Sequence, residues 1–473
     1  MFSAQKKLLV PALAFSLAWL AGCSTYPEKA QEMRDAWARG KFENAEKIAR
    51  AEAFDASKDD QLVWELDFAT ALRACGKIAD SQDVFDGAAK TVAEWDEQPD
   101  ILISSEASAT LLNLTELPYR GRASDRIMLH TYRALNFLEL ARPDEARVAL
   151  NAAFKAQTDA VERNEKEIRA AQESAKKNNV SVDSLENDKS VSAALAKDRA
   201  ESAEIAVYGD YVNPFSTWLH GVYFMHAGDG ASDLERARKS LERVAKMVPQ
   251  NKFVKDDLAD CDSPAKKRTP LTYVIFEYGL APNLVVSRTD LFLPIPTGNG
   301  TTIAPVSIAL PKLSRISSFG APPMTANSLN AQMVCDMNSV VKTDFENAYP
   351  VILSRTLTTA FVKTAASAAS GAIALQAANS DDGAVVALVA LAVYAGTSIF
   401  AVASADADVR AWQTLPENFS LVRLATPGSR KVRVSVAGRD CDVALLPGTV
   451  NVIFVKSAGP GTAPVVSQFV LKK

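Results

Sequence analysis

The stretch AWARGKFENA, residues 36–45, joins two segments in which apolar side chains recur every three or four positions. That spacing is the period of an α-helix. Gly40 is placed to end the first helix, because glycine readily adopts the left-handed backbone conformation that often follows a helix. Phe42 and Ala45 then begin the second helix. The stretch therefore predicts two antiparallel helices joined by a tight turn.

Three further stretches repeat this pattern and predict four helical hairpins in all. Small residues let two helices cross closely, and such hairpins must stack to bury their apolar faces. The units resemble tetratricopeptide repeats, which predicts a TPR-like α-helical solenoid over residues 31–262. Helical hairpins without superhelical order are the alternative. The three further units are 72–78 with Phe85 and Ala88, 132–137 with 143–146, Leu150 and Ala153, and 218–224 with Gly228, Ala237, Leu241 and Pro249.

Two features of this half are candidates for partner binding. A charged segment, 155–205, predicts two long antiparallel helices that project from the repeats, either as a solvated face or as a binding arm. An apolar stripe at helical spacing is either core or the lining of the concave groove that takes peptides in tetratricopeptide domains. The stripe consists of Phe215, Trp218, Val222 and Met225.

The C-terminal half changes to a strand pattern near Asp262. β-branched and aromatic runs bounded by glycine and proline predict strands over 271–340 and again over 405–473. Between them, 341–404 predicts an apolar α-helical hairpin, in which 383–403 carry no charge. This hairpin is either buried, or inserts into a membrane or an oligomeric assembly. The predicted fold class is therefore α+β multidomain, with an antiparallel β-sandwich-like region that contains an apolar helical insert.

The first residues have the pattern of an export signal. Lys6 and Lys7 precede a short apolar run that ends in LAGC at Cys23. This end resembles the lipobox of bacterial lipoproteins, which predicts a signal peptide over 1–22, a lipid on Cys23 and a tether over 23–30. No aspartate follows the cysteine, so we expect the outer membrane, with the protein facing the periplasm.

The remaining chemistry is sparse. Four cysteines are left in an oxidising compartment, and we expect the disulfides Cys75–Cys261 and Cys335–Cys441, with free thiols as the alternative. The three histidines lie on predicted helices without nearby metal ligands. No catalytic, cofactor or metal motif is found. Carboxylates near one another, such as Asp336 and Asp344, do not stand out from solvated acids. The formal net charge of -4 argues against nucleic acid as a partner.

Six motifs together resemble a family of uncharacterised bacterial lipoproteins with a tetratricopeptide-like N-terminal half. They are LPYRG at 117–121, LHTYRALNFL at 129–138, EYGLAP at 277–282, ALPKL at 309–313, Tyr349-Pro350 with Arg355, and DVRAWQTLP at 408–416. The resemblance implies the architecture of the protein and its location in the cell, but it implies no activity. We expect a non-enzymatic scaffold or adaptor that binds an envelope protein. The alternatives are a component of an oligomeric secretion, pilus or envelope assembly, and a cell-wall hydrolase.

Overall fold

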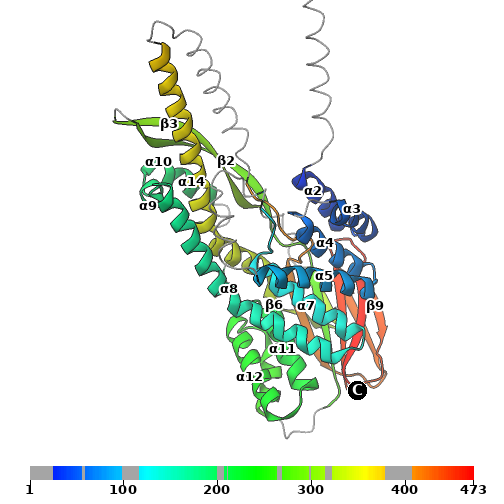
Figure 1. Ribbon diagram of the computed structural model, residues 1–473. Coiled ribbons are helices and arrows are strands. Elements are labelled where there is room, and N and C mark those ends of the chain that lie inside the picture. Colours follow the sequence, from blue (N-terminus) through cyan, green and yellow to red (C-terminus); the bar gives the residue numbers. More distant parts are fainter. Residues whose placement is uncertain are drawn as a thin grey trace, which may run out of the picture.

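A computed structural model describes residues 25–55, 59–97, 115, 117–199, 207–209, 211–263, 269–297, 300–314, 322–378 and 407–473. The predicted signal peptide, Cys23 and the uncharged stretch 383–403 lie outside these residues. The described chain has a helical N-terminal half and sheets in its C-terminal part (Figure 1).

The helical half is built mainly of hairpins of consecutive helices. The four predicted units coincide with the pairs α2/α3, α4/α5, α7/α8 and α11/α12, and α13 follows the last pair. The bounds are α2 (Tyr26–Ala38), α3 (Phe42–Asp55), α4 (Gln61–Ala74), α5 (Ile78–Asp96), α7 (Ala123–Glu139), α8 (Pro143–Lys177), α11 (Pro214–Ala227), α12 (Gly230–Met247) and α13 (Lys252–Asp262).

The turns of these hairpins explain their sequences. Gly40 has a φ of 70° after α2, and the Lys41 amide donates to the Ala36 carbonyl across the turn. A left-handed residue of this kind closes a helix end. In the fourth pair, a β-carbon on Gly221 would lie 2.8 Å from Cγ of Leu241. The small residue is therefore required where α11 and α12 cross.

The charged segment differs from its prediction. α8 continues without a break to Lys177, and the chain returns in the two short helices α9 (Val182–Glu186) and α10 (Lys189–Arg199). Their apolar side chains join a second hydrophobic core instead of forming a wholly solvated pair of helices. The residues of this segment that belong to the second core are Ala175, Val180, Leu185, Val191 and Leu195.

The C-terminal part holds a five-stranded sheet in the order β11-β10-β1-β7-β6 and a four-stranded sheet in the order β5-β4-β8-β9. β1 pairs with β10 in parallel, so the expectation of a purely antiparallel region is wrong at this pair. Strands from before and after the helical insert share both sheets. The bounds are β1 (Leu271–Tyr278), β4 (Met324–Ala326), β5 (Leu329–Asn330), β6 (Gln332–Asp336), β7 (Asn418–Ala425), β8 (Lys431–Val436), β9 (Arg439–Ala444), β10 (Val450–Ser457) and β11 (Val465–Lys472).

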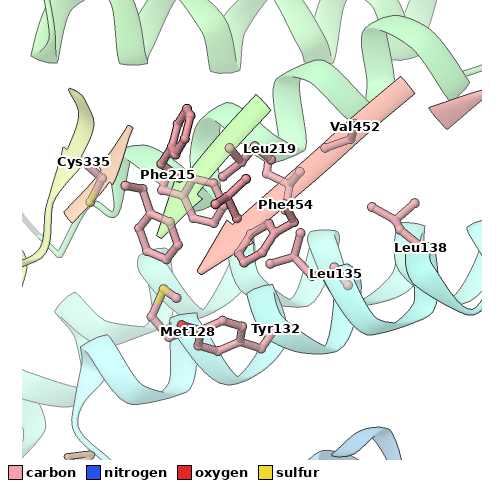
Figure 2. Close-up of a cluster of buried hydrophobic side chains, with 14 of the residues drawn as sticks. Met128, Tyr132, Leu135, Leu138, Phe215, Leu219, Cys335, Val452 and Phe454 are labelled. Atoms are coloured by element: carbon pink, nitrogen blue, oxygen red, sulfur yellow. The ribbon is translucent and has the colours of Figure 1, made fainter. Parts of the chain in front are cut away.

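Both faces of the five-stranded sheet are covered. Side chains of α7, α11 and β10 gather in one cluster on the helical side, among them Tyr132, Leu219 and Phe454 (Figure 2). On the opposite face, Val274 and Ile453 are completely buried. The four-stranded sheet contributes valines to the same core, namely Val432, Val434, Val436 and Val443. Helices and both sheets are therefore joined through one hydrophobic core.

A second core lies in a projection that we call the arm. The arm consists of the distal end of α8, the helices α9, α10 and α14 (Met337–Ala378), and a two-stranded ribbon of β2 (Asn283–Thr297) and β3 (Gly300–Ser314). It extends away from the main body (Figure 1). Leucines of the ribbon and aromatic residues of α14 form its core. No helix in the described ranges is both long and apolar enough to cross a membrane.

Candidate functional site

The predicted peptide groove lies inside the molecule. Phe215, Trp218, Val222 and Met225 are 0%, 1%, 1% and 7% exposed. The ring of Phe215 stacks on Phe419 of β7 at 3.8 Å between centroids. The groove interpretation is therefore wrong for this stripe, because the chain's own sheet occupies the face that would take a peptide.

Beside the stripe, a buried polar cluster connects α11 and α13 to the sheet. Asp257 accepts hydrogen bonds from the Tyr273 hydroxyl at 2.7 Å and from the Trp218 indole at 3.0 Å. Arg423 of β7 lies 2.8 Å from the same carboxylate. Burial raises the pKa of Asp257 to about 6, and the positive charge of Arg423 opposes that shift. The carboxylate is fully engaged within the protein.

A second buried pair joins two strands beneath the helices. Glu277 of β1 and Lys456 of β10 are 2.5 Å apart, and their side chains are only 2% and 5% exposed. The ammonium group lies 4.8 Å from the ring centroid of Trp37 in α2. Burial lowers the pKa of Lys456, while the Glu277 carboxylate acts in the opposite direction. This pair therefore ties the first helical hairpin to the centre of the sheet.

The motif at 408–416 has no regular secondary structure, contains a turn at residues 413 and 414, and contacts α4, α5 and α7. Asp67 of α4 accepts hydrogen bonds from the amide and hydroxyl of Thr414, at 2.9 and 2.8 Å. Trp412 donates to the Thr70 hydroxyl at 3.1 Å and lies against the rings of Phe85 and Tyr132. Burial raises the pKa of Asp67 to about 7, and these hydrogen bonds lower it in part. Residues 408–416, which we call the clasp, thus join the helical hairpins to the sheet.

The other acidic residues considered as a catalytic pair have separate partners. Asp344 accepts from the amide and hydroxyl of Ser124 at the start of α7, at 2.9 and 2.7 Å. Asp336 accepts from the Asn338 amide and the Ser339 hydroxyl at the start of α14, both at 3.0 Å. Each carboxylate satisfies donors at a helix N-terminus, as such residues commonly do. The structure does not bring the two together as an acid–base pair.

A small cavity lies where the clasp meets the arm. It has a volume of about 20 Å³ and is lined by Arg122, Asp125, Leu284, Ala411 and Trp412, among others. That volume holds about one water molecule. Across the described ranges, no group of histidine, cysteine, aspartate and glutamate side chains is arranged to hold a metal ion.

The four cysteines of the described chain are not joined to one another. Cys75, Cys261, Cys335 and Cys441 form no disulfide, so neither expected disulfide is present. Cys335 lies on β6 of the five-stranded sheet, whereas Cys441 lies on β9 of the four-stranded sheet. His220 contacts the Ser240 hydroxyl at 3.0 Å, and burial lowers its pKa to about 4.

The exposed apolar side chains point to the arm as the candidate interaction surface. On the outer face of the ribbon, Phe292 and Ile303 are 57% and 62% exposed, and Pro305 lies directly opposite Phe292.

The buried stripe on α11 could have been recognised from its sequence, because that helix is apolar all round and not on one face only.

No protein-family model matches the chain, and no curated protein matches it. A tetratricopeptide repeat protein from Parabacteroides merdae, known from its crystal structure, is similar to 50% of this chain and to 98% of its own length. The two share 12% sequence identity, and the TM-score is 0.14. At that score the likeness carries no argument about fold or function, and the resemblance to a lipoprotein family stays a prediction.

Proposed function

We propose that this protein is a lipid-anchored scaffold of the bacterial envelope that holds a partner protein through its arm and has no catalytic activity of its own. The observation that carries the proposal is the division of the molecule into two cores. One core unites helices and sheets into a single body. The other builds an arm that projects from this body (Figure 1).

The joint between helices and sheets supports a rigid scaffold. It contains the Glu277–Lys456 pair, the Asp257–Arg423 pair and the clasp around Trp412. Breaking a buried ion pair of this kind is strongly destabilising, so independent movement of the two halves is opposed. We include two finer assignments in this proposal: TPR-like order in the helical hairpins, and the two larger sheets as layers of a sandwich.

The proposed location in the cell rests on the LAGC sequence that ends at Cys23. Acyl chains on this residue would hold the protein at the inner face of the outer membrane, and a stable anchor needs more than one chain. The expected tether over 23–30 is wrong from Tyr26 on, because α2 begins at that residue. The proposed lipid on Cys23 would therefore be joined to α2 by a short segment of chain.

Site-specific photo-crosslinking in the intact lipoprotein tests the scaffold. A crosslinking residue at Val285, 38% exposed on β2, samples the arm. The matched control position is Phe54, 74% exposed on α3. We expect one envelope protein to be captured from Val285 and not from Phe54. Equal capture from both positions, or turnover of peptidoglycan by the purified protein, would refute the proposal; turnover would instead favour the cell-wall hydrolase.

The second candidate is a component of an oligomeric envelope assembly, such as a secretion or pilus complex. The observation that favours it is that α14 leaves the body as part of the arm, and that no charged residue follows Lys363 until Asp381. Light scattering in detergent tests it. Oligomers that are lost in Ala390→Arg would support assembly, whereas a monomer in both proteins would count against it.

A further inference from the structure

Towards its tip the ribbon carries apolar side chains on both faces, and the described chain covers those on one face. Nearer the body, the other face also carries Arg288 and Asp290, which are exposed. Leu291, Leu293 and Ile308 are at most 2% exposed and belong to the second core. On the other face, Phe292 and Ile303 are more than half exposed. Phe292 pairs with Pro305 across the ribbon, and Ile303 follows on the same face, because side chains two positions apart along a strand point the same way.

This apolar face begins close to the predicted lipid anchor. The Tyr26 hydroxyl donates to the Ala411 carbonyl at 2.9 Å, and Ala411 lines the small cavity together with Leu284 at the start of β2. Cys23 precedes Tyr26 by three residues, so its Cα lies within about 11 Å of that of Tyr26. In Figure 1, α2 lies at the end of the body from which the ribbon and α14 project.

The exposed residues lie part-way along the ribbon. Phe292 follows Leu284 by eight residues on β2, which is about 27 Å at the rise of an antiparallel strand. The exposed face is therefore about 27 Å along the ribbon from the end that lies beside Tyr26 and Ala411. An exposed patch of this kind is typical of a surface that contacts a membrane or a protein.

The prolines of the ribbon argue against a second copy that would add a strand. Four prolines of the ribbon lie at equivalent positions of the antiparallel register. They are Pro294 and Pro296 on β2 and Pro305 and Pro311 on β3, and their cross-strand partners are Ile303, Thr301, Phe292 and Val286, respectively. Proline has no N–H, so it is tolerated where the donor would point away from the ladder. The outer edges thus have fewer donors for a further strand than a proline-free ribbon would have.

From these observations we infer that the outer face of the β2–β3 ribbon lies on the same membrane in which Cys23 is anchored. Phe292, Ile303 and Pro305 contact the boundary between headgroups and acyl chains. Arg288 and Asp290 lie on the same face and are exposed, and charged side chains are costly to place in the hydrocarbon. The contact is therefore shallow. The inference rests on the proposed lipid anchor and adds a second point of membrane contact.

Tryptophan fluorescence in vesicles tests this contact. The intact lipoprotein carrying Phe292→Trp is reconstituted in vesicles of phosphatidylethanolamine and phosphatidylglycerol, with bromine atoms placed high on the acyl chains. Leu446→Trp is the matched control, because Leu446 is 42% exposed and lies beside Gln468 of β11, and Ile303→Trp is a second probe of the ribbon. After subtraction of the unsubstituted protein, we expect about twofold or more stronger quenching at 292 and 303 than at 446, because interfacial residues enter only the headgroup and upper acyl region.

The outcomes separate the ribbon contact from the anchor. If the acylated protein fails to float with vesicles while an acylated control lipoprotein does, the anchor is wrong and the inference falls with it. If the protein floats but positions 292 and 303 are quenched no more than position 446, the anchor stands and the ribbon contact is refuted. An emission blue shift at 292 that depends on protein concentration without vesicles would assign the face to a second copy and overturn the inference.

Discussion

The buried pair Glu277–Lys456 gives the sharpest test of how the two halves are held together. The two charged groups are 2.5 Å apart and almost fully buried. At an effective dielectric constant of about 20, their attraction is about 7 kcal/mol. Removing each ion from water costs several kcal/mol. The two contributions nearly cancel, so the pair as a whole adds little to the free energy of unfolding.

Removal of one partner has a much larger effect. Lys456→Met leaves Glu277 as an uncompensated charge and is expected to lower the free energy of unfolding by about 3–5 kcal/mol. Lys456→Met combined with Glu277→Gln is expected to lie within about 1 kcal/mol of the unsubstituted protein, since an apolar or neutral replacement of a buried pair is often neutral. The double variant should therefore be more stable than the single one.

Urea unfolding of the non-acylated Cys23→Ser chain measures these differences. Far-ultraviolet circular dichroism follows the helices, and tryptophan fluorescence follows the joint around Trp37 and Trp412. Coincident transitions are needed before one free energy is assigned to the chain. The reasoning is refuted if Lys456→Met alone costs less than about 1 kcal/mol, or if the double variant is as unstable as the single one, because either result would mean that no buried charge is left uncompensated.

Three further predictions address the clasp, the stripe on α11 and the thiols. Burial raises the pKa of Asp67 to about 7 from about 3.9 in the unfolded chain. The contribution of Asp67 to the free energy of unfolding is therefore fully present below about pH 4. It is lost as the pH rises to about 7, by about 1.4 kcal/mol per pH unit. Urea midpoints should fall less steeply across this window in Asp67→Asn than in the unsubstituted protein, and an equal slope in the two proteins would contradict the assignment. Phe215→Ala should lower the free energy of unfolding by about 3–5 kcal/mol, whereas a loss below about 0.5 kcal/mol would fit a surface groove residue. Thiol titration without reductant should find Cys75, Cys261, Cys335 and Cys441 all reactive after unfolding. The buried Cys335 should react slowly in the native protein. If two or four of these thiols fail to react after unfolding, the expected disulfides are present after all.

The helical hairpins could be predicted from sequence because their determinants are local. A glycine with positive φ ends α2, and a second one, Gly76, follows α4. The arm could not be predicted in the same way. On α8 the residues that face inward are largely alanines, such as Ala160, Ala171 and Ala175, and alanines between charged residues give only a weak apolar stripe. The segment therefore resembled a solvated helix.

The sheet order and the joint depend on contacts between distant residues. β1 is a continuous apolar run, buried along its whole length, which is typical of a central strand with both faces covered. Its pairing partners lie far along the chain, so local periodicity could not identify them. Glu277 and Lys456 did leave a trace in the sequence. Each is a lone charge in an apolar strand, and such a charge is expected to find an opposite partner.

The parallel pairing of β1 with β10 also sets the order in which the fold can be completed. Leu271 pairs with Val450 on one side and Ala425 on the other, so β1 has neither neighbour until most of the chain has been synthesised. Contacts of such long sequence separation form slowly. A chain that ends before residue 450 would keep its helical hairpins but expose an apolar strand that is prone to aggregation. The central strand of this sheet is therefore covered on both edges only once residues 418–457 are present.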